Sequence, residues 1–269
     1  MTRIFTPAVI VPLAIVSMTQ PSTSDHGAGD DAQEPLASPP KQEKSSLFDD
    51  FMDIFYAPSS VFARRENANF WIPLLIVSVL LGIIFIANRD LMEPIMDAEM
   101  TRAMAKSGRQ MTPEQLEAAR KLGTGFASVG AFVGPPLLIL CMGIVLWIVG
   151  KFFDAKESLN TALVVAAYAT VPRVVEGIVN RVQGLLVDTS SINSRFSLSL
   201  GLGRFVDPDT QPVLLAIVGR IDVFTIWVTM LLVIGLAVTG KISRGRAAIA
   251  GIVMWVLGAL PTVAGALRQ

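Results

Sequence analysis

An uncharged apolar run of 24 residues, Phe126 to Val149, is the feature that most constrains the fold of this chain. At about 1.5 Å per residue, a helix of that length covers the roughly 30 Å hydrocarbon core of a bilayer. Four other apolar segments have comparable length. The sequence therefore predicts an all-α, polytopic membrane protein, a bundle of five transmembrane helices near residues 70–87, 126–149, 159–187, 221–239 and 247–266.

The composition agrees with a membrane location and excludes one class of partner. Hydrophobic residues make up 52% of the 269 residues and charged residues only 16%, whereas soluble domains carry about 25% charged residues. Because 22 basic residues balance 22 acidic ones, no basic excess is present to neutralise a nucleic-acid backbone. Nucleic acid is not predicted as a partner.

Residue types that support catalysis are scarce. Cys141 is the only cysteine and His26 the only histidine, which excludes an internal disulfide and a Cys/His metal cluster. The segment "GLGRF" at Gly201 lacks the third glycine and the following Lys-Ser/Thr of a phosphate loop. We therefore predict no enzyme activity, no catalytic residue, no metal and no cofactor.

The N-terminal region, residues 1–46, is predicted to be a disordered tail. From residue 20 to 46 it is rich in Pro, Ser, Asp, Glu, Gly and Gln, a composition that buries too little apolar surface to offset the entropy of ordering. The apolar segment 4–16 is too short to span a bilayer and has no A-x-A-like cleavage site after it. It is either a weak secretory signal or a mobile or mis-started N-terminus.

A short amphipathic helix is predicted to open the membrane domain, residues 47–269. Its apolar positions occur at helical spacing, three aspartates take the other side, and Pro58 ends it. Such a helix either lies along the membrane interface or packs under the bundle. The apolar positions are Leu47, Phe48, Phe51, Met52 and Phe55, and the acidic ones Asp49, Asp50 and Asp53.

Two longer connections separate the predicted spans. Residues 88–124 carry six basic and six acidic side chains and suggest two short helices. For the second, Thr112 is a plausible N-cap, Pro113 suits the first turn, and Gln115 completes a capping box. Residues 188–218 contain Ser, Gly and Pro, and predict a loop with one short helix.

Basic residues in the short connections predict the orientation. With five crossings they fall on one side, which is the cytoplasmic side by the positive-inside rule. The longer segment 88–124 then lies outside, where its balanced charge carries less weight. The N-terminus is predicted to be cytoplasmic and the C-terminus outside; the residues that decide this are Arg64, Arg65, Lys151, Lys156, Lys241, Arg244 and Arg246.

Charged residues inside a predicted span form the candidate site. Arg173 and Glu176 are three residues apart and share a helix face, and Asp222 begins the next span from the same side. The structural interpretation is a charge-paired group that holds the third span against the fourth. The functional interpretation is a solute or proton site beside the break at Pro172; Pro135 and Pro136 mark a further predicted helix break.

Small residues four apart predict close helix packing at two places. Gly130 and Gly134 form one pair, and Ala247 and Gly251 form another. In membrane bundles such pairs let two helices approach closely.

The third and fourth spans resemble the YIP1 domain family. "AYATVPRVVEGI" (Ala167 to Ile178) is similar to that family's polar, proline-containing helix, and "IDVFTIWVTMLLVIGLAV" (Ile221 to Val238) to its next one. "DIFYAPSSVF" (Asp53 to Phe62) is similar to the stretch before the first span in bacterial members. The resemblance runs from about Leu47 to the end of the chain.

The resemblance implies a five-helix bundle with a cytoplasmic N-terminus, in a bacterial cytoplasmic membrane, and no catalytic activity. Eukaryotic relatives are linked to Rab-type GTPases through motifs that this sequence lacks, so that partner is not carried over. Besides the lipid bilayer, we expect other membrane proteins or further copies of the chain as partners. The leading hypothesis is a membrane scaffold or adaptor; the alternative is a small-solute transporter or channel that uses Arg173 and Glu176.

Overall fold

The computed structural model describes residues 46–108, 112–188, 191–192 and 194–267. Over these residues the chain is helical, and the β pairing there is a single isolated bridge between Gly201 and Asp222. The all-α prediction is confirmed for this part of the chain. The predicted N-terminal tail and its segment 4–16 lie outside the described residues, apart from Ser46.

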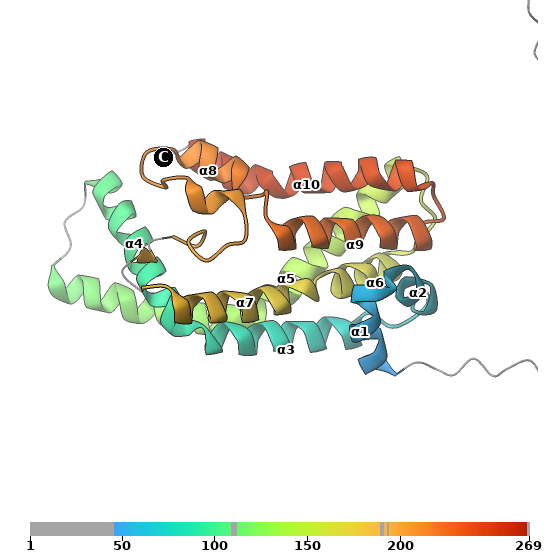
Figure 1. Cartoon of the computed structure of the whole chain (residues 1–269), viewed down its shortest axis with the longest axis horizontal. Helices are drawn as coiled ribbons and strands as arrows, with labels where there is room; N and C mark the ends of the chain where they lie inside the picture. The colour runs from blue at the N-terminus through green and yellow to red at the C-terminus, as the bar shows by residue number, and fades with distance from the viewer. Residues whose placement is uncertain (1–45, 109–111, 189–190, 193, 268–269) are drawn as a thin grey trace, which may run out of the picture. The chain divides into compact units, whose positions relative to one another are not determined.

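Helices α1 (Leu47–Tyr56) and α2 (Pro58–Arg64) form a bent pair that packs on the bundle (Figure 1). Ser46 caps α1 in a capping box with Asp49, and Pro58 starts a new helix, as the sequence predicts. The ring centres of Phe51 and Tyr168 are 5.4 Å apart, and those of Phe55 and Trp227 are 5.3 Å apart. These contacts support packing on the bundle, while Phe48, Met52 and Tyr56 stay exposed on the other side of α1.

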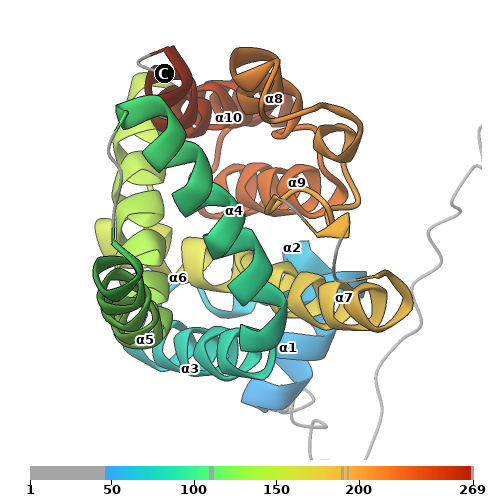
Figure 2. The same ribbon diagram turned by 90° about the vertical axis from the view of Figure 1, so that its left-hand side faces the viewer.

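Helix α3 (Trp71–Ala87) is joined to α4 (Arg89–Ser107) by a bend of 74°. Helix α4 runs across the end of the bundle where α3 finishes (Figure 2). Its buried side chains, Leu91 and Ile95, pack with Ile192 and Leu198 from the connection after α7. Gly108 ends α4 with φ +63°, a left-handed conformation that glycine adopts without strain.

Helix α5 (Pro113–Phe152) is 40 residues long, or about 60 Å. Its capping box between Thr112 and Gln115 is present, as predicted. The helix is not the separate short helix plus span that the sequence suggests, because no residue ends it between the two. The predicted break at Pro135 and Pro136 is wrong, since α5 continues through both residues. The two prolines have no backbone N–H to donate, and the backbone hydrogen bonds of the turns before and after them maintain the helix.

The third predicted span consists of two helices, α6 (Leu159–Ala169) and α7 (Pro172–Leu186). Ser158 caps α6. Every residue from Thr161 to Ala169 is buried, so α6 is the central helix of the bundle, and its alanines let its neighbours approach. Pro172 begins α7, which places the predicted break between the two helices where the sequence expects it.

The connection after α7 contains the 3₁₀ turn η2 (Leu202–Phe205) and the short helix α8 (Pro212–Val218). The last two long helices, α9 (Val223–Thr239) and α10 (Arg244–Leu267), lie side by side (Figures 1 and 2). Gly251 of α10 is buried against Val233 of α9, and Ala247 is fully buried. The small-residue pair of α10 is thus in close helix packing, as predicted.

By length and composition alone, three helical segments are long and apolar enough to cross a membrane: α5, α6 with α7, and α10. The bent pair of α3 and α4 raises the number to four if it counts as one span. Helix α9 is apolar but has only 17 residues, about 26 Å. Each of the five predicted apolar segments is therefore helical, and a membrane protein with several apolar helices is what these lengths support.

Candidate functional site

The predicted ion pair within the third span is present in α7. The guanidinium of Arg173 donates to Oε2 of Glu176 over 2.6 Å, so the i, i+3 spacing does place both groups on one helix face. A second guanidinium nitrogen donates to Oγ1 of Thr225 in α9 over 3.0 Å. Arg173 therefore links the start of α7 to the start of α9.

Asp222 lies beside this pair but has its own partners. Its carboxylate accepts hydrogen bonds from the backbone N–H of Phe224 at 2.9 Å and of Thr225 at 3.2 Å, and from the Ser199 hydroxyl at 2.8 Å. It is the N-cap of α9, where a negative charge is favoured by the helix dipole. The three predicted residues are thus gathered at the first turn of α9, with Thr225 as the contact between Asp222 and Arg173.

Arg220 is a fourth charged residue at this place, which the sequence analysis missed. One terminal nitrogen donates to the carbonyl of Trp255 in α10 over 3.3 Å, and the guanidinium carbon lies 5.9 Å from the centre of the Trp255 ring. The Nε atom is buried and has no hydrogen-bond partner in the described part of the chain. No carboxylate among the described residues lies within ion-pair distance of it. The sequence feature that points to Arg220 is its position directly before the predicted fourth span.

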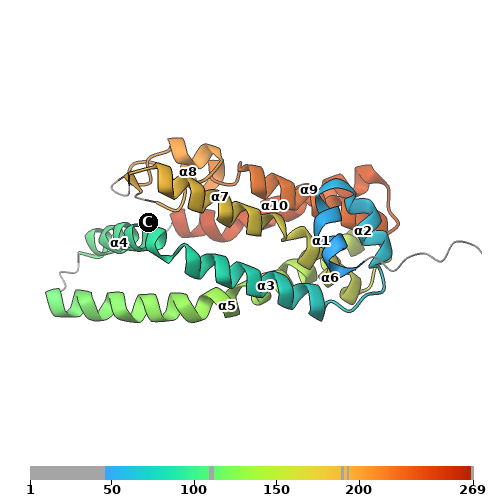
Figure 3. The same ribbon diagram turned by 60° about the horizontal axis from the view of Figure 1, so that its bottom comes forward.

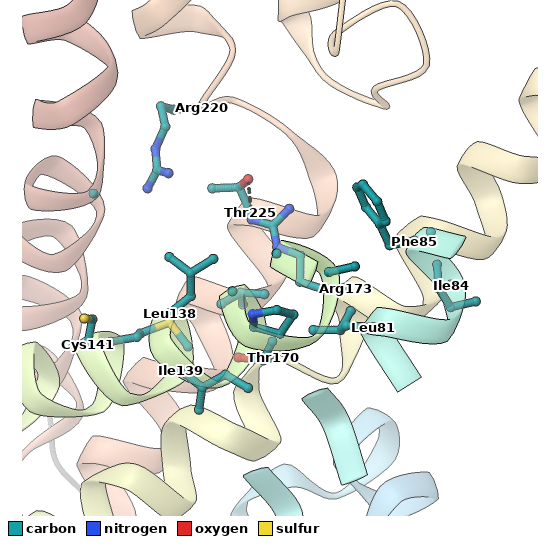
Figure 4. Close-up of a pocket in the computed structure, with 18 of the residues that line it drawn as sticks. Leu81, Ile84, Phe85, Leu138, Ile139, Cys141, Thr170, Arg173, Arg220 and Thr225 are labelled. Atoms are coloured by element: carbon teal, nitrogen blue, oxygen red, sulfur yellow. Dashed lines mark hydrogen bonds between the residues drawn. The ribbon is translucent and has the colours of Figure 1, made fainter. Parts of the chain in front are cut away.

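Both arginines line a cavity of about 1060 Å³ inside the bundle (Figure 4). Its walls come from α3, α5, α7, α9 and α10, and the first turn of α4 adds to one end. Most of the lining is apolar. Its polar groups, besides Arg173 and Arg220, are the side chains of Asn88, Thr170, Asn180, Thr225 and Thr229.

Gly130 and Gly134, the other predicted small-residue pair, line this cavity. A Cβ atom added at either position would meet no atom within 4 Å, so neither glycine is packed against a neighbouring helix. The prediction of close packing at this pair is wrong, because the space beside these residues is part of the cavity.

A second ionic cluster joins α1 to the end of α2. Asp50 is fully buried, although the sequence places it on the polar side of α1, and it accepts hydrogen bonds from Arg64 at 2.6 Å and from Arg65. Arg64 also pairs with Asp53 at 2.8 Å. The hydrogen bond that Arg64 donates to Asp50, and next the one that it donates to Asp53, raises the pKa of Arg64 above its ordinary value. This cluster holds the bent pair together from within.

Glu157 is a buried acid in the turn between α5 and α6. Its carboxylate lies against Gly150 and Gly240 and has no hydrogen-bond partner among the described residues. Burial raises the pKa of this carboxyl above its ordinary value of 4.5; the residue's own backbone N–H, and next the charge of Lys151, offset only part of the effect. The described residues contain no group of three or more His, Cys, Asp or Glu side chains placed to hold a metal ion.

A model of the Yip1 domain matches residues 52–265, which include α2 to α9 entire, nearly all of α10 and every residue that lines the cavity. The chain belongs to the Yip1 family. The family resemblance read from the three segments is confirmed, and Yip1 proteins are not known as enzymes.

A bacterial relative is similar over most of this Yip1 chain. Membrane protein YknW of Bacillus subtilis (strain 168) is 27% identical over 238 residues, which cover 83% of this chain and 94% of the relative. No solved structure matches the chain. The comparisons thus support a bacterial-type Yip1 membrane protein.

Proposed function

We propose that this Yip1 protein is a five-span membrane scaffold or adaptor that works without catalysis and binds other membrane proteins. The spans are α3, α5, α6 with α7, α9 and α10, with the N-terminus in the cytoplasm and the C-terminus outside. The helices α3 and α9 cover about 26 Å each, which modest thinning of the bilayer accommodates. Residues 47–269 then form one membrane domain.

The observation that carries the adaptor role is the part of α5 that extends beyond the bundle. Residues 113–125 precede the predicted span and add about 20 Å of helix; with α4 they form a projecting arm (Figures 1 and 3). The ion pair of Arg120 with Asp97, 3.1 Å long, joins the two helices of the arm. An arm that adds little to the core of the bundle is suited to contact a partner.

An apolar stripe at helical spacing begins on the arm and continues into the first two turns of the predicted span. Leu122, Phe126 and Val129 lie at positions i, i+4 and i+7 and are 63%, 76% and 65% exposed. Exposed apolar side chains in such a row mark interaction surfaces. We infer that a partner membrane protein, or a second copy of the chain, packs on this stripe.

Site-specific crosslinking in native membranes tests the adaptor role. A photo-crosslinking amino acid at Leu122 is expected to capture a defined membrane protein, whereas the same group at Lys121, exposed on the same helix but turned by about 100°, is not. Mass spectrometry identifies the product. Capture of nothing by either position, or equal capture by both, contradicts the proposal.

Reporter tags test the five-span topology separately. A tag at the N-terminus is expected to be protected from an external protease, and a tag after residue 269 to be cleaved in intact cells whose outer layers are permeable. Tags that report the same compartment at both ends require an even number of spans and contradict the topology.

A transporter or channel is the second candidate, favoured by the cavity next to the break at Pro172. The cavity is lined by Arg173, and broken helices beside intramembrane charge mark substrate paths in transporters. Uptake of radiolabelled small organic anions into proteoliposomes tests it. Uptake that depends on the protein and disappears in the double variant Arg173→Met with Glu176→Gln, which leaves no unpaired charge, would place this function above the adaptor.

A further inference from the structure

The cavity carries an unbalanced positive charge. Arg173 and Arg220 both line it, and none of the side chains that line it is acidic. The nearby carboxylates of Glu176 and Asp222 do not line the cavity: the first pairs with Arg173, and the second caps α9. Among the described residues, Arg173 therefore has a carboxylate partner and Arg220 has none.

Arg220 has more donors than partners. A guanidinium carries five N–H groups, and in the described part of the chain Arg220 uses one, for the Trp255 carbonyl. Its Nε is buried without a partner. A guanidinium whose other N–H groups have no partner among the described residues is a suitable binding group for an anion such as a phosphate.

Asn88 is a further polar residue in the lining of the cavity. Asn88 is 7% exposed and lines the cavity, and its amide nitrogen donates to the carbonyls of Ile84 and Gly177. Its Oδ1 is buried and has no donor among the described residues. Asn88 thus adds a polar side chain to the lining at the end of α3.

The apolar part of the cavity fits hydrocarbon chains. On α5 and α10 the lining includes exposed residues, Leu138 and Cys141 on one helix and Leu257, Gly258 and Pro261 on the other. The glycines at 130 and 134 leave open space beside α5. An acyl chain fits against this mostly apolar lining.

The polar and apolar parts of the cavity follow one another as the headgroup and the acyl chains of a lipid do. Arg220 directly precedes the predicted fourth span, at the level of the headgroups, and the apolar lining of α5 and α10 runs from there into the core. Figure 4 shows Arg220 on one side of the cavity and Leu138 and Ile139 across from it. The cavity volume of about 1060 Å³ lies at the upper end of the range for ligand sites.

We propose that this cavity binds one anionic phospholipid, whose phosphate pairs with Arg220 and whose acyl chains lie along α5 and α10. Binding supplies the counter-charge that Arg220 lacks. This site goes beyond the adaptor function and does not rest on it, since a lipid can bind whether or not the arm has a partner.

Native mass spectrometry of the delipidated full-length protein tests the proposal. Dioleoylphosphatidylglycerol is expected to give a one-to-one adduct at a concentration about tenfold below that needed for dioleoylphosphatidylcholine, whose phosphate is balanced by its own cation. Inorganic phosphate, which has no chains, is expected to give no adduct. Equal binding of the two lipids, or binding of phosphate alone, would overturn the proposal.

Two variants locate the site. Arg220→Gln is expected to weaken the phosphatidylglycerol adduct about tenfold, as for loss of a hydrogen bond to a charged group, and Arg220→Lys to weaken it less. Gly134→Leu is expected to weaken it as much by filling the cavity. The matched control is Gly125→Leu, on the same helix and also in open space but outside the cavity lining, which should bind like wild type.

Folding of the variants can be separated from binding. Arg220 is partly buried and has no carboxylate partner among the described residues, so the melting temperature of lipid-free Arg220→Gln is expected to be equal to or above that of wild type. If Arg220→Gln and Gly134→Leu are folded and retain the wild-type adduct, the lipid does not occupy this cavity.

Discussion

The Arg173 guanidinium donates to the Thr225 hydroxyl over 3.0 Å, and so joins the first turn of α7 to the first turn of α9. Because the same side chain is also paired with Glu176, one residue holds the broken third span and orients it against its neighbour. Loss of either Arg173 or Glu176 would leave the other without its partner in this ion pair.

Replacement of Arg173 by Met is expected to destabilise the protein by about 3 kcal/mol, since Glu176 is left as an unpaired charge in the bundle. The double variant Arg173→Met with Glu176→Gln should recover most of that loss. Thermal unfolding in detergent measures both. If the double variant is as unstable as the single one, the ion pair is not what Arg173 contributes.

Replacement of Asp50 by Asn is expected to lower stability by about 3 kcal/mol, because Arg65 loses the carboxylate that it contacts and Arg64 keeps only Asp53. The control variant is Asp53→Asn. Asp53 is 41% exposed, and its ion pair is with Arg64. Its effect should stay below about 1 kcal/mol. Equal melting temperatures for the two variants would show that burial of Asp50 is unimportant.

Replacement of Glu157 by Gln is expected to stabilise the protein at neutral pH. Burial raises the pKa of this carboxyl in the folded state, so its folding contribution is fully present below the ordinary pKa of 4.5 and is lost as the pH rises through the folded-state pKa. The variant and wild type should unfold alike near pH 4 and differ by about 2 °C at pH 8. Glu117→Gln, at an exposed residue, should not change this pH dependence.

Replacement of Gly251 by Val is expected to separate α9 from α10, because Val233 occupies the space that the new side chain needs. Overpacking of this kind costs about 1–3 kcal/mol. Gly265→Val, on the same helix with nothing within 4 Å, should be tolerated. A wild-type melting temperature for Gly251→Val would mean that the two helices are less closely packed than the structure shows.

The apolar segments and their caps were predictable because each depends on residues close together in the sequence. The capping box at Thr112 and the break before Pro172 are local effects, and both are where the sequence expects them. The ion pair of Arg173 and Glu176 is local as well, since three residues separate the two on one helix.

The rest depends on contacts between distant segments, which no local pattern contains. Asp50 is on the polar side of an amphipathic helix by its spacing, and only the fold of α2 brings Arg64 and Arg65 over it. Gly130 and Gly134 have the spacing of a packing pair, but whether a helix fills the space beside them depends on the position of α10. The sequence analysis missed Arg220 for the same reason, since its hydrogen-bond partner among the described residues, the Trp255 carbonyl, belongs to the distant helix α10.

The length and continuity of α5 have a mechanical consequence. A single rod of about 60 Å connects the arm at Pro113 with the turn at Phe152, and one wall of the cavity lies on it between them. Because one continuous helix contains the arm, the cavity wall and the last residues before the turn, these three parts cannot shift along the helix axis independently of one another.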